Sequence, residues 1–306
     1  MKIIRDLKKQ DLLPSVATVG FFDGVHVGHQ YLINQVKKEA KKRQEASMVI
    51  TFSNHPGSVM QEGADVSLLS LPNEKCKLLE WMGIDYCLLI EFTPSFSHYS
   101  AYEFMQLLYT QFNVKVLFVG YDHRFGYARN EGFDDYVRFG QTIGIEVLQT
   151  DVYTADDLVI SSSAVRSLLE KGDVDTASTI LNAPYTITGK VVKGHQVGRL
   201  IGFPTANLVV DPQKLIPAEG VYAVYVWSGE HRYVGMLSIG SRPTFSAEMK
   251  QSVEVNILDV TADFYHKMLT LQFMHRLRDN KKFPGVENLI EQLNKDENEV
   301  RKLLIS

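Results

Sequence analysis

The chain has 306 residues, 45% hydrophobic and 22% charged, and a formal net charge of −4. This length suits two ordinary domains of a globular protein. The sequence has no apolar run long enough to span a membrane, no secretory signal at its N-terminus and no basic stripe for nucleic acid. Its two cysteines, Cys76 and Cys87, predict neither disulfides nor a cysteine zinc site, so a reducing cytoplasm is expected.

The first half of the chain alternates short apolar runs with helical patterns. Strands are expected at 15–21, 47–52, 85–90, 114–119 and 145–149, and helices near 29–43, 73–82, 99–112, 132–142, 164–170 and 174–181. This alternation predicts a mainly parallel sheet with helices on both faces. Ligands of such sheets bind beyond the carboxyl ends of the strands.

The pattern changes near Asn182, where β-rich stretches separated by Gly, Pro and charged turns begin. They lie at 185–193, 221–227, 232–239, 252–258 and 268–273. This half of the chain is predicted to form an antiparallel barrel or sandwich, followed by an amphipathic helix near the C-terminus. The predicted domains are therefore 1–182 and 183–306.

The segment 18–29 joins the first predicted strand to the first predicted helix. His26 and His29 stand at this junction, and Gly24 and Gly28 leave the backbone open to a ligand. Free N–H groups and the helix dipole make such a corner an anion site, and two imidazoles can donate hydrogen bonds to phosphoryl oxygens. Alone, two histidines three residues apart are usually surface residues or metal ligands. The interpretation as an anion site therefore depends on the predicted strand before them and the predicted helix after them. H-x-G-H in this setting resembles the nucleotidyltransferase superfamily.

Three further segments of the first half carry polar side chains at expected ligand positions. His55 follows the second strand, and the loop 120–126 carries Asp122 and Arg124 after another. Ser161, Ser162 and Ser163 open a helix, where hydroxyls ordinarily cap free N–H groups. With Arg166 one turn further on, the same corner could grip a phosphate.

Taken in order, the motifs H-x-G-H, T-F-x-x-H-P, G-x-D-x-R-F-G and S-S-S-x-x-R resemble the FMN adenylyltransferase module of bacterial bifunctional riboflavin kinase/FAD synthetases. The resemblance implies a Rossmann-like nucleotidyltransferase domain. It implies ATP and phosphate binding by Gly20, Phe21, Asp23, Gly24, Gly28, Ser161, Ser162, Ser163 and Arg166, with His26 and His29 catalytic. It implies flavin binding by His55, Asp122 and Arg124.

Residues 189–208 resemble the riboflavin kinase signature, a Gly-spaced loop followed by Pro-Thr-Ala-Asn. This second resemblance implies a kinase β-barrel in which Lys190, Gly194, Gly198, Gly202 and Pro204 bind ATP phosphates. It implies that Thr205 and Asn207 hold Mg²⁺, whose preferred ligands are hard oxygens. It also assigns Glu254 as the general base and Arg242 and Arg278 to the flavin site.

The resulting hypothesis is a cytoplasmic bifunctional enzyme that phosphorylates riboflavin to FMN and adenylylates FMN to FAD. Its partners are expected to be small molecules, riboflavin, FMN and ATP, with no nucleic acid or membrane, and the protein to be a monomer or weak homo-oligomer. Phe22, His123 and the spacing of 129–132 depart from the adenylyltransferase pattern. They leave open a riboflavin kinase with a degenerate or regulatory first domain. A non-catalytic flavin sensor is a third possibility, which the presence of Glu254 argues against.

Overall fold

The computed structural model describes residues 1–60, 66–121, 123–127, 131–150, 153, 159–194, 197–242 and 250–305. Of Met60, Val197, Arg242 and Lys250 it describes the backbone alone. The chain divides into two compact units, Met1–Ser162 and Ser163–Ser306. Among the helices in these ranges, none combines the length and apolar character that crossing a membrane requires.

The first unit is built on a six-stranded sheet whose neighbouring strands are all parallel. The strands are β1 (Lys2–Ile4), β2 (Ser15–Val19), β3 (Ala46–Phe52), β4 (Tyr86–Ile90), β5 (Val114–Val119) and β6 (Glu146–Gln149), in the order β1-β4-β3-β2-β5-β6. The central strands β2 and β3 are buried on both faces, as is usual in a parallel sheet covered by helices.

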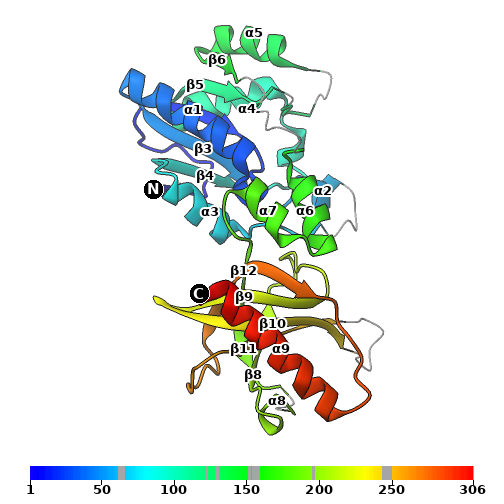
Figure 1. Cartoon of the computed structure of the whole chain (residues 1–306). Coiled ribbons are helices and arrows are strands. Elements are labelled where there is room, and N and C mark those ends of the chain that lie inside the picture. Colours follow the sequence, from blue (N-terminus) through cyan, green and yellow to red (C-terminus); the bar gives the residue numbers. More distant parts are fainter. Residues whose placement is uncertain are drawn as a thin grey trace. The chain divides into compact units, whose positions relative to one another are not determined.

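Helices cover both faces of this sheet (Figure 1). On one face α1 (Val27–Arg43) and α3 (Pro72–Trp81) pack over Val49 and Cys87, and on the other α4 (Ala101–Phe112) packs over Met48 and Leu88. Adjacent strand residues point to opposite faces, so each strand supplies both layers. The remaining elements of this unit are α5 (Phe133–Ile143) and the short helices η1 (Asp23–Val25), α2 (Pro56–Met60) and η2 (Phe96–His98).

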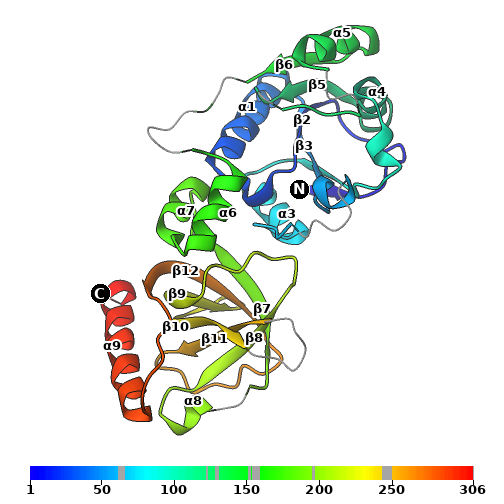
Figure 2. The ribbon, with the colours of Figure 1, turned by 90° about the vertical axis from the view of Figure 1, so that its right-hand side faces the viewer.

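The second unit contains a closed antiparallel barrel of six strands in the order β10-β11-β8-β7-β12-β9. The strands are β7 (Thr186–Val192), β8 (Thr205–Val210), β9 (Gly220–Ser228), β10 (His231–Arg242), β11 (Lys250–Ile257) and β12 (Met268–Arg278). The helices are α6 (Ser162–Lys171), α7 (Val174–Leu181), α8 (Val197–Leu200) and α9 (Val286–Leu304). Figure 2 shows α9 lying along the outside of the barrel, where Val300 packs with Val221 and Met236.

The predicted fold class is confirmed: a parallel α/β sheet with helices on both faces, then an antiparallel barrel with a terminal helix. Two strands were not predicted. β1 has only three residues, and β8 begins inside the Pro-Thr-Ala-Asn motif, which reads as a turn.

The domain boundary at 182/183 remains a prediction. The compact units divide twenty residues earlier, so most of α6 and all of α7 belong to the unit that contains the barrel.

Candidate active sites

The turn after β2 has an unusual backbone. Phe22, Gly24 and Val25 have φ values of 52°, 75° and 45°, all in the left-handed region. Glycine adopts this region freely, whereas phenylalanine and a β-branched residue do so at a cost. Both of those side chains are buried between α1, α3 and the sheet, and this packing offsets the cost.

Asp23 fixes the position of this turn. Its buried carboxylate accepts hydrogen bonds from the backbone N–H groups of Leu69 and Ser70 at 3.1 and 2.9 Å. The Ser70 hydroxyl in turn accepts from the Gly24 N–H at 2.9 Å. The predicted phosphate-binding role of Asp23 remains a prediction, and the contacts observed for its carboxylate hold the turn against the segment before α3.

His26 and His29 form a stacked pair at the start of α1. His26 is the N-cap residue, and its Nδ1 accepts from the backbone N–H of His29 at 3.3 Å. The two ring centroids are 3.6 Å apart with the planes inclined by 17°, and Phe22 meets His29 edge-on at 5.1 Å. Gly28 matters here, because a Cβ at that position would lie only 3.3 Å from atoms of the His26 ring and of Ile160.

Both imidazoles are neutral at pH 7. Burial lowers the pKa of His26 from 6.5 to about 4, outweighing the opposing effect of Asp23. Burial also holds the pKa of His29 well below its usual value, and positive charge on His26, Lys75 and His123 lowers it further. The buried Nδ1 of His29 has no hydrogen-bond partner among the described residues. A bound anion would raise both pKa values, because an opposite charge favours the protonated ring.

An aromatic cavity of about 680 Å³ lies at the carboxyl ends of β2 and β3. Phe21, Phe52, Phe92, Phe96, Phe125 and Tyr127 are among the residues that line it. This volume and apolar character are typical of a small-molecule site. The cavity lies at the edge of the sheet where the sequence predicts ligands.

The predicted flavin-binding residues of this unit are found at or near that cavity. Arg124 lines it, and His55 packs edge-on against the Phe21 ring at 4.7 Å while its Nδ1 accepts from the Gly57 N–H at 3.0 Å. Asp122 lies outside the described residues, as do residues 128–130 of the loop whose spacing departs from the family pattern.

Ser162, the last residue of the first unit, donates from its hydroxyl to the Asp23 carbonyl at 2.9 Å. Ser161 is half-buried beside it, and Ser163 is exposed. Arg166 lies one helical turn further along α6 and is half-buried. Gly20, another predicted phosphate-binding residue, lies just before the H-x-G-H turn and donates its N–H to the Ile50 carbonyl at 3.0 Å.

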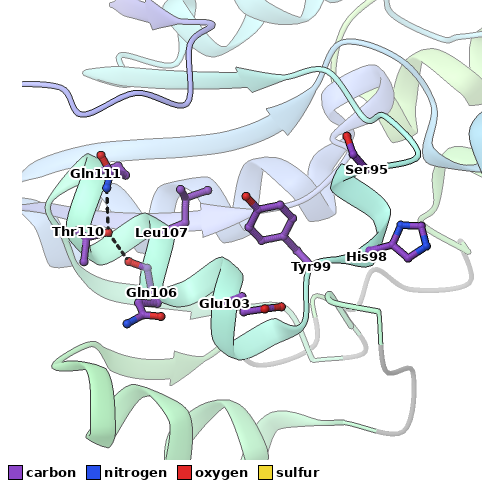
Figure 3. Close-up of a pocket in the computed structure, with 8 residues that line it drawn as sticks. All are labelled: Ser95, His98, Tyr99, Glu103, Gln106, Leu107, Thr110 and Gln111. Carbon is purple, nitrogen blue, oxygen red and sulfur yellow. Dashed lines mark hydrogen bonds between the residues drawn. The ribbon is translucent and has the colours of Figure 1, made fainter.

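A second cavity, of about 610 Å³, lies on the outer side of η2 and α4 (Figure 3). Figure 3 shows Tyr99 and His98 at one end and Gln106, Thr110 and Gln111 at the other. None of the predicted site residues lines this cavity. Its lining residues lie between Ser95 and Gln111, and none of them belongs to the H-x-G-H turn.

In the second unit, four oxygen-bearing side chains meet across β8 and β11. Glu254 pairs in register with Asn207, and Asn256 with Thr205. The Thr205 hydroxyl donates to Glu254 Oε2 at 3.4 Å, and the Asn256 amide donates to the Pro204 carbonyl at 2.7 Å. Residues paired directly across antiparallel strands present their side chains on the same face. The predicted base and both predicted metal ligands are therefore neighbours.

The Gly-spaced loop packs directly on this group. A Cβ at Gly194 would lie 2.3 Å from the Asn207 amide, and one at Gly198 would lie 2.2 Å from the Phe203 carbonyl. The Gly198 contact is with backbone, so that position requires glycine, whereas a side chain at Gly194 would force the Asn207 side chain to move. Gly202, at φ 88°, completes the turn into β8.

A cavity of about 530 Å³ adjoins the same loop and is lined by Arg199, Pro204 and Thr205, with residues 260–265 opposite. Lys190 is exposed on β7, in register with Met268 of β12. Arg242 ends β10, and its side chain is not described.

Arg278 is held in a buried ion pair. Its guanidinium donates to both carboxylate oxygens of Asp296 on α9 at 2.6–3.0 Å, and this bidentate pair ties α9 to β12. The flavin-binding role assigned to Arg278 stays a prediction.

Comparison with known proteins accounts for both units. The family model described as FAD synthetase matches residues 8–164, and the one described as riboflavin kinase matches residues 181–304. The bifunctional riboflavin kinase/FMN adenylyltransferase of Escherichia coli is 35% identical over 302 residues, which cover 97% of this chain and 96% of the relative. That of Bacillus subtilis is 33% identical over 300 residues, covering 96% and 93%. This chain belongs to the bifunctional riboflavin kinase/FMN adenylyltransferase family.

A solved structure of similar length is also available for comparison. A crystal structure of a protein named macrolide-efflux protein, from Streptococcus pneumoniae, is 31% identical and covers 98% of both chains with a TM-score of 0.91.

Sequence reasoning missed two residues of the adenylyltransferase unit of this family member. Lys75 on α3 is buried and donates from Nζ to the carbonyls of Phe21 and Phe52, both at 2.8 Å. The Tyr136 hydroxyl accepts from the Phe125 N–H at 3.1 Å and donates to the Phe125 carbonyl at 3.2 Å. The Lys75 contacts join distant parts of the chain, the Tyr136 contact spans eleven residues, and neither residue belongs to a motif that would have singled it out.

Proposed function

We propose that the first unit transfers AMP from ATP to FMN and that the second unit phosphorylates riboflavin. One observation supports this proposal: each family match contains a group of residues suited to the reaction of that family. The FAD synthetase match contains the stacked histidines and the aromatic cavity, and the riboflavin kinase match contains Glu254 against the Gly-spaced loop.

In the adenylyl transfer, a phosphate oxygen of FMN attacks the α-phosphorus of ATP. A new phosphoanhydride bond forms, the bond between the α-phosphorus and its bridging oxygen breaks, and pyrophosphate leaves. His26 and His29 donate hydrogen bonds to the phosphates, and their proton affinity rises as negative charge accumulates. The start of α1 adds its free N–H groups and dipole.

Ser161, Ser162, Ser163 and Arg166 hold the triphosphate in this proposal, and the aromatic cavity receives the flavin ring. Its Phe and Tyr walls suit a planar aromatic ligand, because aromatic pairs prefer offset-stacked or edge-on contacts. Arg124, which lines the cavity, binds the FMN phosphate in this proposal. Positioning and electrostatic stabilisation are the main sources of catalysis in phosphoryl chemistry of this kind.

In the kinase reaction, the ribityl 5′-hydroxyl of riboflavin attacks the γ-phosphorus of ATP, and ADP leaves. Glu254 takes the hydroxyl proton, a role that requires only a carboxylate within hydrogen-bond reach of the nucleophile. The Gly-spaced loop, with Gly194, Gly198, Gly202 and Pro204, lies against the strands that carry this base and cradles the phosphates. Lys190, Arg242 and Arg278 complete the proposed ATP and flavin contacts.

The residues around Glu254 fit Mg²⁺. Thr205 and Asn207 offer a hydroxyl and an amide oxygen beside a carboxylate, a hard oxygen set of the kind that binds Mg²⁺ together with substrate phosphates. When bound, Mg²⁺ neutralises phosphate charge. The close packing of Gly194 on Asn207 brings the phosphate loop to the same place.

The proposal places the enzyme in the cytoplasm as a monomer or weak homo-oligomer acting on small molecules. Its two cysteines, Cys76 and Cys87, are free and buried, as in proteins of reducing compartments.

Product chromatography with Glu254→Gln tests the kinase assignment. Wild-type protein with riboflavin, ATP and Mg²⁺ is expected to form FMN and then FAD. The variant should form FMN at least about 10²-fold more slowly, because it lacks the general base, while its conversion of added FMN to FAD stays at the wild-type rate. Wild-type kinase activity in the variant would remove Glu254 from this role.

A further inference from the structure

Lys75 is a buried lysine that no part of the proposed chemistry uses. The residue is 1% exposed, and the hydrogen bonds found for its Nζ go to backbone carbonyls. Burial lowers the pKa of Lys75 to about 8, although nearby Asp23 opposes this. Burying an ammonium without an acidic partner is costly. A specific set of contacts must hold it there.

The residues that Lys75 contacts, Phe21 and Phe52, both line the aromatic cavity. Nζ donates to the carbonyl oxygens of Phe21 and Phe52, each at 2.8 Å, and lies 4.2 Å from the centroid of the Phe21 ring. An ammonium has three donors, so two carbonyls and one aromatic face satisfy all of them. The Phe21 carbonyl also accepts from the Thr51 hydroxyl at 2.9 Å.

The two bonded residues stand at the ends of neighbouring strands. Phe52 is the last residue of β3, and Phe21 follows β2 by two residues, just before the left-handed turn that leads to His26. Both rings line the cavity of about 680 Å³. The ladder between β2 and β3 ends at the Val19–Ile50 pair, and the Gly20 N–H donates to the Ile50 carbonyl. Beyond that point, Lys75 joins the two backbones.

We propose that Lys75 is a positioning residue for the flavin: it fixes Phe21 and Phe52 as two walls of the aromatic cavity and so sets the affinity of this site for the isoalloxazine ring of FMN. This inference rests on the proposed adenylyltransferase function. Lysine suits the task because one compact group can donate to two carbonyls and to a ring face at once. A residue that served only the packing of α3 would not need the charge, and methionine would fill the same space at lower cost.

Steady-state kinetics of FAD formation in the full-length protein test this role. Lys75→Met removes the donors and keeps the volume, and we expect it to raise KM for FMN about tenfold or more while changing KM for ATP less than twofold. Lys75→Arg keeps two or more donors and should recover most of the FMN affinity, and Lys75→Gln, whose shorter amide reaches one carbonyl, should fall between. If the methionine variant fails to fold, the difference in KM for FMN between the arginine and glutamine variants carries the same test.

Leu79→Ala is the matched control. Leu79 is also buried and lies one turn further along α3, where it packs in the hydrophobic cluster with Val49 and Cys87, but it is not a lining residue of the cavity. We expect this variant to lower the melting temperature and to leave KM for both substrates unchanged.

An unchanged KM for FMN in Lys75→Met, an equal rise in both KM values, or the same rise in Leu79→Ala would overturn the proposal. A wild-type protein that forms no FAD would instead overturn the adenylyltransferase function itself. The two failures are therefore distinguishable.

Discussion

His26 has two roles that a single substitution separates. Its Nδ1 caps α1 by accepting the His29 N–H, and its ring stacks on His29 in the proposed phosphate site. Asparagine is among the most favourable N-cap residues and does not titrate, so His26→Asn keeps the cap and removes the imidazole. The contribution of the ring to acid stability can then be measured without breaking the helix.

We expect the free energy of unfolding to fall as the pH drops from about 6.5 to about 4. The pKa of His26 is lowered from 6.5 to about 4 in the folded state, so between these values the unfolded chain binds more protons. The loss from this residue is about 3 kcal/mol at most, since each pKa unit corresponds to about 1.4 kcal/mol. His29 contributes in the same direction, because its pKa is lowered too.

Urea unfolding at pH 7 and pH 5 measures this effect. The difference between the two free energies of unfolding should be smaller in His26→Asn than in the wild type. Equal differences in both proteins would mean that the buried imidazole is not the source.

Phe22 shows why a departure from a family pattern can have a local reason. A phenylalanine is unusual in the left-handed region, which glycine and asparagine tolerate better. Phe22 has φ 52° and is buried against the α1–α3 layer, so its backbone follows that conformation while its side chain adds apolar burial. The substitution therefore fits the turn and does not by itself indicate a degenerate site.

At the scale of elements, α9 is attached to the barrel by an apolar stripe and by one buried ion pair. Arg278 and Asp296 are 13% and 2% exposed, and the pair is bidentate. Breaking a buried pair leaves one charge without its partner, at a cost of about 3–5 kcal/mol. An exposed pair on the same helix, Lys295–Glu291, is screened by solvent and contributes little.

Asp296→Asn is therefore expected to destabilise the protein by about 3 kcal/mol or more, and Glu291→Gln to have little effect on stability. Denaturant unfolding of the two variants beside the wild type measures both values. Similar small effects in the two variants would show that the Arg278–Asp296 pair does not anchor α9.

Most regular elements could be predicted from periodicity, and the elements that could not are short or have long-range partners. β1 depends on β4 for its pairing, and β8 on β7 and β11. The H-x-G-H turn, the serines of α6, Thr205, Asn207 and Glu254 stand in recognisable motifs. Lys75 does not, because a lysine in a helical pattern ordinarily faces solvent, and its partners lie 54 and 23 residues away. The aromatic cavity was missed for the same reason, since it forms only when the strand ends come together.

At the scale of the whole molecule, the packing of α6 and α7 decides whether the folded kinase domain begins before or after these two helices. Within the second unit, the Ala218 N–H donates to the Leu169 carbonyl of α6 at 2.9 Å, and Asp175 of α7 meets His275 of β12 at 2.7 Å. A Cβ at Gly172 would lie 2.5 Å from the Arg276 guanidinium, so the connection between the two helices packs closely on β12. These contacts predict that both helices stabilise the barrel.

A fragment of residues 163–306 should accordingly melt at least about 4 °C above a fragment of residues 183–306, the shift that roughly 1 kcal/mol gives in a domain of this size. Thermal unfolding followed by circular dichroism compares them. Equal melting temperatures would favour the predicted boundary at 182/183 as the limit of the folded kinase domain.

We propose that one chain carries two active sites, and the alternatives differ in what the first unit does. A kinase with a degenerate first domain would make FMN and stop there. The measurement is product chromatography after incubation with FMN, ATP and Mg²⁺, with His29→Ala in parallel. We predict FAD and pyrophosphate from the wild type, and a rate at least about 10²-fold lower from the variant, as for loss of a transition-state donor. Absence of FAD from a wild-type protein that still converts riboflavin to FMN would contradict the account.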